Sequence, residues 1–206
     1  MSFRTGVFDA TDPDAVDRAV ALLRAGQVVA LPTDTVYGVA VDPFHPGAVD
    51  RLFAAKERPR SVQVPVLVSS VDDVAALIDG PLDVFARRLI DRHWPGALTI
   101  VLPRAAERRD LDLGGDPTTI GLRCPDHRLV RELCRQVGPL ATTSANRHGE
   151  PTPPDAAGVA AALGDTVALV LDGGICEGSP STVVSVLGDE VTILREGRIP
   201  TAALLR

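Results

Sequence analysis

The sequence predicts a single α/β domain with a mixed β-sheet. Short apolar runs with strand character alternate with segments whose apolar residues recur at helical spacing. Near the end of the chain, two apolar runs flank Gly188 and Asp189, which indicates an antiparallel hairpin. A sheet that contains such a hairpin is not purely parallel. The sequence contains no internal repeat and no linker, so we expect residues 1–206 to form one domain.

The first helix is defined at both of its ends. Asp12 can cap the N-terminus and Pro13 suits the first turn, while apolar residues recur on one face as far as Leu23. Gly26 follows at a position where helices commonly end. These signals predict a helix between Pro13 and Gly26.

The remaining elements follow from the same patterns. Apolar runs predict strands at residues 28–31, 64–68, 98–102, 119–123, 140–143, 168–171, 182–186 and 191–194. Helical spacing predicts helices at residues 48–55, 71–78, 82–91, 129–136 and 155–163. The segment between the strands at 98–102 and 119–123 is rich in Arg, Asp and Gly, and we expect a surface loop there.

Composition and charge limit the classes of function. With 45% hydrophobic and 23% charged residues, the chain is typical of a globular protein, and its net charge of -6 disfavours a general nucleic-acid coat. Cys124, Cys134 and Cys176 have no zinc-ligand spacing, so we expect three reduced thiols in a cytoplasmic protein. The N-terminus lacks the apolar region of a signal peptide, and no apolar run is long enough to cross a bilayer.

Five polar segments follow or end the predicted elements, where α/β proteins place their ligands. They are PTDTVYG at residues 32–38, KERPR at 56–60, TTIGLRCP at 118–125, ATTSAN at 141–146, and STVV at 181–184 together with LREG at 194–197. Each segment also has a purely structural interpretation, as a turn, a charged helix end or a surface ion pair. Function therefore depends on whether the segments come together.

The charged residues of these segments indicate what they could bind. Lys56, Arg58 and Arg60 suit a polyphosphate clamp, although a solvated helix end would have the same pattern. Arg123 ends an apolar strand, where a guanidinium group needs a partner. That partner is either a carboxylate or phosphate of a ligand, or a carboxylate of the protein.

The terminal hairpin and several missing motifs narrow the chemistry further. If the hairpin forms, Ser181 and Arg195 come close together. None of the four His residues has metal-ligand spacing. The sequence contains no P-loop motif, so ATP binding by a P-loop is not predicted. It contains neither a nucleophile-elbow motif nor the residue order of a Ser/His/Asp triad, so covalent catalysis by an activated Ser is not predicted either.

Taken together, the segments resemble the YrdC-like family of threonylcarbamoyl-AMP synthases. The five segments above, the last of them extended to ILREG from Ile193, occur in family order with two further matches, which are HWPGALTIVL from His93 and LDGG from Leu171. The resemblance covers the chain from about Val28 to Gly197, and it is closest to the short, single-domain (TsaC-like) form. It implies a twisted mixed β-sheet flanked by helices, with a concave, positively charged cavity.

The resemblance also implies roles for individual residues. The positions that match L-threonine-binding positions of the family are Thr33, Arg123, Ser144 and Ser181, and the neighbouring Thr35 is a further candidate for threonine binding. The positions that match the surroundings of ATP are Lys56, Arg58, Thr119, Asn146 and Arg195. We expect Lys56, Arg58 and Arg195 to be the catalytic cations, with no buried structural role of their own.

The implied activity joins L-threonine, bicarbonate and ATP to give threonylcarbamoyl-AMP and pyrophosphate, for the threonylcarbamoyladenosine modification of tRNA. The threonine amine would form a carbamate, whose oxygen attacks the α-phosphorus of ATP, so positioned charge is needed and a protein nucleophile is not. Mg²⁺ would accompany ATP with mostly water and phosphate ligands, and we name no protein metal ligand. The implied partners are a downstream threonylcarbamoyl-transferase complex and, through a weak contact, tRNA or double-stranded RNA.

Two departures from the family pattern and two alternatives accompany this prediction. Residues 61–63 read Ser-Val-Gln where the family commonly has an Asp followed by Pro-Leu, and His148 stands where the family's usual S-A-N-x-S-G pattern has its second Ser. The first change affects expected contacts with the nucleotide or within the loop, and the second affects one expected contact with a phosphate. The alternatives are a carbamoyl-transfer module and a non-catalytic RNA-binding module, and the acidic net charge argues against the second.

Overall fold

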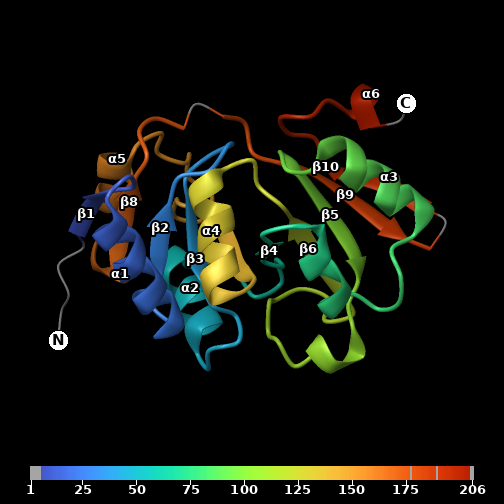
Figure 1. Ribbon diagram of the computed structural model, residues 1–206, viewed down its shortest axis with the longest axis horizontal. Helices are drawn as coiled ribbons and strands as arrows, with labels where there is room; N and C mark the ends of the chain where they lie inside the picture. Colours follow the sequence, from blue (N-terminus) through green and yellow to red (C-terminus); the bar gives the residue numbers. More distant parts are fainter. Residues whose placement is uncertain (1–5, 177, 189, 205–206) are drawn as a thin grey trace.

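The computed structural model describes residues 6–176, 178–188 and 190–204. These residues form one twisted sheet of ten strands with helices packed against it (Figure 1). The strands are β1 (Gly6–Asp9), β2 (Val29–Leu31), β3 (Gly38–Val41), β4 (Val66–Leu67), β5 (Leu98–Pro103), β6 (Thr119–Arg123), β7 (Leu140–Ser144), β8 (Leu169–Asp172), β9 (Thr182–Leu187) and β10 (Glu190–Arg195). The α-helices are α1 (Pro13–Arg24), α2 (Ala48–Lys56), α3 (Val84–His93), α4 (Arg128–Val137), α5 (Ala156–Leu163) and α6 (Thr201–Leu204).

The sheet is mixed, as the sequence predicts. Its strand order is β1-β8-β2-β3-β7-β4-β6-β5-β9-β10. Parallel pairs join β8 to β1 and β2, β4 to β6, and β5 to β9, whereas the other neighbours run antiparallel. The fold class is therefore α/β with a single twisted mixed sheet flanked by helices, and the prediction is confirmed.

Two hydrophobic clusters fill the opposite faces of this sheet. Alternating residues at β2 divide between them: Val29 and Leu31 pack with α1 and α4, while Ala30 and Val28, which directly precedes the strand, pack in the larger cluster with α2 and α5. This alternation is the two-residue period of a strand that is buried on both faces. Only 3% of the residues are aromatic, so Val, Leu, Ile and Ala supply most of both clusters.

The first helix follows its sequence signals closely. The Asp12 carboxylate accepts a hydrogen bond from the backbone of Asp14 at 3.0 Å and caps α1. At the other end, Gly26 has a φ of +69°, a left-handed conformation that glycine adopts without strain. The helix therefore begins and ends where the sequence predicts.

Other elements differ from the sequence prediction. The short strands β1 and β3 and the helix α6 are not predicted, because each has only four residues and too few positions to establish a period. The helix expected at residues 71–78 is a 3₁₀ helix at Val71–Ala76, and the strand expected at 64–68 shortens to Val66–Leu67. The expected loop after β5 contains a 3₁₀ turn at Ala106–Arg108. Within the hairpin, Asp189 lies outside the described residues.

One connection crosses most of the sheet. It joins β8, the second strand in the sheet order, to β9, the ninth (Figure 1), and we call its described residues, 173–176 and 178–181, the strap. The strap passes directly over the β2–β3 connection, because a Cβ atom on Gly178 would lie only 2.0 Å from the carbonyl oxygen of Thr35. Among the described residues, no helix is both long enough and apolar enough to span a bilayer.

Candidate active site

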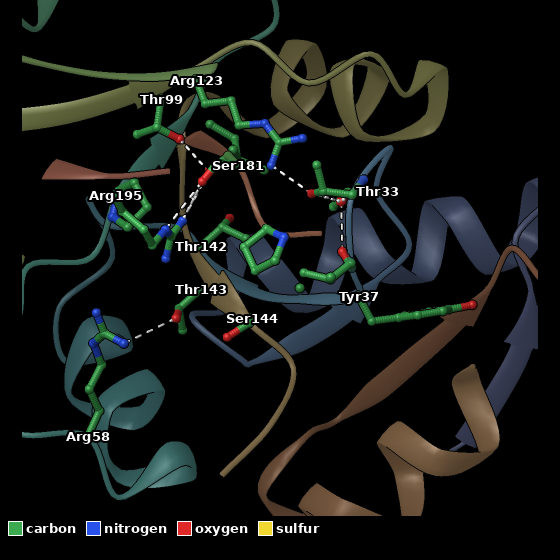
Figure 2. A pocket seen from close by; sticks show the side chains of 16 residues that line it. Thr33, Tyr37, Arg58, Thr99, Arg123, Thr142, Thr143, Ser144, Ser181 and Arg195 are labelled. Atoms are coloured by element: carbon green, nitrogen blue, oxygen red, sulfur yellow. Dashed lines mark hydrogen bonds between the residues drawn. The ribbon is translucent and has the colours of Figure 1, made fainter. Parts of the chain in front are cut away.

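A pocket of about 150 Å³ lies where several connections and strands meet (Figure 2). Its walls come from the β2–β3 connection, the end of α2, the strands β4 to β7, and the start and end of the terminal hairpin. The lining residues are Thr33, Thr35, Val36, Tyr37, Gly38, Arg58, Pro65, Leu67, Thr99, Arg123, Thr142, Thr143, Ser144, Pro180, Ser181 and Arg195. Three guanidinium groups and a series of hydroxyl groups thus share one small cavity.

The β2–β3 connection contributes two hydroxyl groups whose hydrogen bonds are fixed by their partners. Thr33 Oγ1 donates to the carbonyl of Val36 at 2.7 Å and accepts from the backbone N–H of Thr35 at 3.1 Å. It also lies 3.0 Å from Thr35 Oγ1, which must therefore be the donor of that pair. Thr33 is saturated by these bonds. Thr35 has given away its hydrogen and can offer a ligand only a lone pair.

Arg123, at the end of β6, is held by three acceptors of the protein. Its guanidinium donates to Gly96 O at 3.0 Å, to Thr35 Oγ1 at 2.9 Å and to Asp34 Oδ1 at 2.6 Å. The side chains of this ion pair are only 8% and 15% exposed. Burial lowers the pKa of Arg123, and the adjacent Asp34 carboxylate opposes that effect. The sequence left open whether the partner of Arg123 is a ligand or a carboxylate of the protein, and the structure shows a protein carboxylate, that of Asp34. Two of the five N–H groups of the Arg123 guanidinium remain for a ligand.

The terminal hairpin brings Ser181 and Arg195 together, as its pairing predicts. Arg195 Nη2 donates to the carbonyl of Ser181 at 2.8 Å and to its hydroxyl at 3.3 Å. The same hydroxyl lies 2.9 Å from Thr99 Oγ1 on the neighbouring strand β5. Burial and the positive charge of Arg123 lower the pKa of Arg195.

Arg58 extends from the end of α2 toward the same cavity. Its guanidinium donates to the carbonyls of Val62 at 3.2 Å and Gln63 at 3.1 Å, and to Thr143 Oγ1 at 3.4 Å. Burial and the charge of Arg195 lower the pKa of Arg58. Two of these three contacts are to backbone carbonyls of residues 61–63, the Ser-Val-Gln segment that differs from the family pattern. They therefore do not depend on the side chains of that segment.

Lys56 has a structural role that the sequence does not reveal. Its side chain is 1% exposed, and its ammonium donates to Asn146 O at 2.6 Å, to Asn146 Oδ1 at 3.0 Å and to the carbonyl of Ser144. Burial, followed by the charge of Arg58, lowers the pKa of Lys56 to about 8. The expectation that Lys56 has no buried structural role is therefore wrong, because it fastens α2 to the turn after β7.

The turn after β7 carries one hydroxyl that faces the pocket. Ser144 Oγ donates to Asn146 Oδ1 at 2.5 Å, so its lone pairs are left for a ligand. The amide of Asn146 donates to the carbonyls of Arg147 and Glu150 and is fully used inside the turn. The side chain of His148, the other departure from the family pattern, is exposed to solvent, and its backbone N–H donates to the carbonyl of Lys56 at 3.0 Å.

The pocket thus gathers most, but not all, of the predicted residues. The lining includes Thr33, Thr35, Arg58, Arg123, Ser144, Ser181 and Arg195, whereas Lys56, Thr119 and Asn146 lie outside it. Thr119 is at the start of β6, at the other end of the strand from Arg123. Its carbonyl accepts from Gln63 Nε2 at 2.9 Å. Sequence reasoning missed Thr99 as a lining residue, although a Thr inside an apolar strand is a signal for a buried hydroxyl that needs a partner.

The chemistry of this site is electrostatic. Across the described ranges, no group of three or more His, Cys, Asp or Glu side chains is arranged to hold a metal ion. Burial raises the pKa of Cys176, in the strap, and raises the pKa of Cys124 to about 11, so neither thiol is an activated nucleophile. The site can therefore hold anions and orient hydroxyl and amine groups.

Comparison with known proteins assigns the chain to a family. The sequence pattern of the Sua5/yciO/yrdC family, described as "Telomere recombination", matches residues 21–197. A Mycobacterium tuberculosis protein, described provisionally as a threonylcarbamoyl-AMP synthase, is 43% identical over 202 residues, which are 96% of this chain and 92% of that protein. Threonylcarbamoyl-AMP synthase from Bacillus subtilis is 37% identical over 191 residues, which are 92% of this chain and 55% of that protein.

A solved structure agrees with these relatives. The crystal structure of P. abyssi Sua5 complexed with L-threonine superposes with a TM-score of 0.82 at 30% identity. The match covers 91% of this chain and 55% of that one. The family pattern, the identities and the shared fold all span most of the chain. The chain belongs to the Sua5/yciO/yrdC family.

Proposed function

We propose that this chain is an L-threonylcarbamoyladenylate synthase, an enzyme that forms threonylcarbamoyl-AMP and pyrophosphate from L-threonine, bicarbonate and ATP. Relatives with the name of this activity are 37% identical or more over most of the chain. The observation that carries the proposal is the clustering of Arg58, Arg123 and Arg195 with neutral hydroxyl groups in one pocket. Three cations suit a reaction in which a carboxylate, a carbamate and phosphate groups meet.

Arg123 is the group that we assign to the threonine carboxylate. The Asp34 ion pair and the bond to Gly96 hold its guanidinium in one orientation, with two N–H groups to spare. A guanidinium that is fixed in advance loses little side-chain entropy when a carboxylate binds to it in bidentate fashion. The P. abyssi Sua5 complex with L-threonine supports a threonine site in a protein of this fold.

The hydroxyl and amine groups of threonine need acceptors, and the pocket supplies two. Thr35 and Ser144 both donate their own hydrogens to the protein, so each turns only lone pairs toward a ligand. Thr33 is saturated and serves to fix Thr35. We therefore assign the direct recognition of the threonine hydroxyl or amine to Thr35 and Ser144, and a supporting role to Thr33.

ATP would bind where the remaining cations converge. Arg58 and Arg195 repel each other electrostatically, which a polyphosphate between them would relieve. Lys56 and Asn146 hold the adjoining turn, and Thr119 is left as a more distant candidate contact with the nucleotide. We expect Mg²⁺ to arrive with ATP and to keep phosphate and water ligands.

The reaction then needs no bond to the protein. The threonine nitrogen attacks carbon dioxide with loss of a proton, or bicarbonate with loss of water, and an oxygen of the resulting carbamate attacks the α-phosphorus, with pyrophosphate as the leaving group. The protein contributes proximity and fixed positive charge. We further propose a cytoplasmic protein that passes its product to a threonylcarbamoyl-transferase complex and contacts tRNA or double-stranded RNA weakly.

One incubation tests the proposal. The purified protein is mixed with ATP, L-threonine and bicarbonate, and the acyl-adenylate and pyrophosphate are measured by mass spectrometry and a phosphate assay. We expect both products, and neither when bicarbonate is removed from degassed buffer. Pyrophosphate release that is independent of bicarbonate would refute threonylcarbamoyl chemistry, and activity only with carbamoyl phosphate would favour the carbamoyl-transfer alternative.

A further inference from the structure

The strand β5 turns one buried hydroxyl group toward the pocket. Thr99 is 3% exposed and interrupts the apolar run Leu98–Pro103. A buried hydroxyl is costly without a hydrogen-bond partner, and the partner of Thr99 is Ser181, at 2.9 Å between the two oxygens. The two side chains face each other at the edge of the cavity (Figure 2). The position of Thr99 therefore couples it to a residue that lines the site.

Counting hydrogens restricts what this pair can do. Each hydroxyl group has one hydrogen and two lone pairs. Arg195 Nη2 donates to Ser181 Oγ at 3.3 Å and occupies one lone pair. If Thr99 donates to Ser181, the second lone pair is occupied as well. Ser181 then has only its own hydrogen to offer, so it is a donor and cannot be an acceptor toward the pocket.

On the opposite wall of the pocket, Thr35 is a hydrogen-bond acceptor toward a ligand. Thr35 donates to Thr33 and accepts from Arg123, so it offers a lone pair. Ser181, when Thr99 donates to it, instead offers a hydrogen next to the positive charge of Arg195. A ligand that satisfies both walls places a hydrogen-bearing group near Thr35 and a negatively charged oxygen near Ser181.

We propose that Thr99 is a positioning residue, which donates to Ser181 Oγ and thereby directs the Ser181 hydrogen to an oxyanion of a substrate. The oxyanion is either the carboxylate of the amino acid or a phosphate oxygen of ATP. This inference rests on the proposed function, because it takes L-threonine and ATP as the ligands. The proposed role of Thr99 acts through Ser181, which is the more exposed member of the pair.

Isosteric substitution separates the hydroxyl group of Thr99 from its volume. Thr99→Val keeps the shape of the side chain and removes the hydrogen that orients Ser181, whereas Thr99→Ser keeps that hydrogen. Two affinities are measured by calorimetry, one for L-threonine without nucleotide and one for α,β-methylene-ATP, which cannot release pyrophosphate. We expect Thr99→Val to weaken one of them by about fivefold to tenfold, which is the usual effect of losing one hydrogen bond between neutral groups.

The ligand that is affected identifies the oxyanion. A loss for L-threonine alone assigns it to the carboxylate, and a loss for α,β-methylene-ATP alone assigns it to a phosphate. Thr99→Ser should restore the affinity to within about twofold. Ser185→Ala removes another buried hydroxyl of the β5–β9 strand pair, outside the pocket, and serves as the matched control with unchanged affinities.

A double variant shows whether Thr99 acts through Ser181. Ser181→Ala removes the group that Thr99 orients, so Thr99→Val combined with Ser181→Ala should bind no more weakly than Ser181→Ala alone. Additive losses would overturn the inference, as would unchanged affinities in Thr99→Val or equal losses in Thr99→Ser. A wild-type protein that binds neither ligand would overturn the proposed function together with this inference, whereas the other outcomes leave the proposed function intact.

Discussion

At the scale of single residues, the pocket separates side chains that meet the ligand from those that hold them in place. Arg58 and Arg195 reach the cavity and keep N–H groups for phosphate oxygens, while Lys56 spends all three of its donors on the turn after β7. All three are cations in matching sequence segments. Their hydrogen-bond partners, which lie up to 90 residues away, distinguish the two roles.

Replacing the two pocket cations should abolish most of the activity and leave the fold unchanged. Arg58→Ala and Arg195→Ala should each lower kcat by roughly 10²–10³, the usual effect of removing one fixed donor from a charged transition state. Arg87→Ala, which removes a surface arginine of α3, should have the wild-type rate. Pyrophosphate release and circular dichroism check this prediction, and near-normal turnover in both pocket variants would contradict the phosphate assignment.

Selectivity for the amino acid should follow the hydrogen bonds of its hydroxyl group. Thr35 and Ser144 present lone pairs, so valine would leave them buried without a partner, whereas serine lacks only a methyl contact. A missing methyl costs about 1–3 kcal/mol, and an unsatisfied polar pocket rejects an analogue more strongly. The rates of pyrophosphate release at equal concentrations should therefore fall in the order threonine, serine, valine. Equal rates for threonine and valine would exclude a hydroxyl-reading pocket.

The buried Lys56 makes stability depend on pH. Because its pKa is about 8 in the folded protein and near 10.5 in an unfolded chain, the folded state loses this proton first. Burying the charge therefore destabilises the fold fully below pH 8, and this cost disappears as the pH rises from about 8 to about 10.5. Relative to Lys56→Met, which has no titrating group there, the wild type should gain about 2 kcal/mol of unfolding free energy between pH 7 and pH 9.5.

Urea denaturation of both proteins at the two pH values measures this difference, and the comparison cancels all titrations that the two share. A difference that stays constant, or one that moves in favour of Lys56→Met, would show that the three oxygen acceptors of the ammonium outweigh its burial.

At the scale of secondary-structure elements, the strap controls one side of the pocket. Its first residues are fastened by Tyr37, whose hydroxyl donates to Gly174 O at 2.8 Å and accepts from the N–H of Gly173 at 3.2 Å. Its last residues, Pro180 and Ser181, line the cavity. The strap therefore connects the β2–β3 turn to the hairpin across the site.

A methyl group in the strap should disturb this arrangement. Gly178→Ala would place a Cβ atom 2.0 Å from the carbonyl oxygen of Thr35, so the strap or the turn must move. We expect the KM for threonine to rise by roughly tenfold and the unfolding free energy to fall by about 1–3 kcal/mol. Ser179→Ala, at the exposed neighbouring position, is the control and should change neither quantity. Unchanged KM and stability in Gly178→Ala would show that the strap does not press on the turn.

The elements that sequence reasoning predicts well are those with enough residues to show a period. The helix α1 has a cap, an apolar face and a terminal glycine, and each signal is local. The four-residue strand β3 has no such signals and exists because β2 and β7 offer backbone hydrogen bonds on both of its sides. The site divides in the same way: motif residues such as Arg123 could be predicted, whereas the pairing of Thr99 with Ser181 depends on two strands that are distant in sequence.

At the scale of the whole molecule, the cysteines are part of the packing and take no part in the reaction. Cys124 and Cys134 are buried and Cys176 is half-buried, and all three are free thiols. Burial raises the pKa of each of them, so they stay protonated at neutral pH. Their thiols contact backbone carbonyls of Ser69, Leu67 and Thr33, which places them between elements of the fold.

Removing all three thiols should therefore leave the chemistry unchanged. A protein with Cys124→Ala, Cys134→Ala and Cys176→Ser should keep kcat within about twofold and lose about 1–3 kcal/mol of stability from the small cavities. Elemental analysis of the wild type should find no zinc. Stoichiometric zinc, or loss of turnover in a variant that still folds, would contradict a purely structural role for the thiols.

The long reach of the strap has a consequence for how the protein is made. Arg58 and Arg123 are synthesised early, but Ser181 and Arg195 belong to a hairpin that can join the sheet only beside β5, more than 80 residues upstream. While the hairpin is still inside the ribosome, the part of the chain that has already emerged exposes half of a charged pocket and cannot close it. Completion of the pocket thus depends on synthesis of the chain as far as Arg195, and a copy that stops before the hairpin lacks two of the groups that line it.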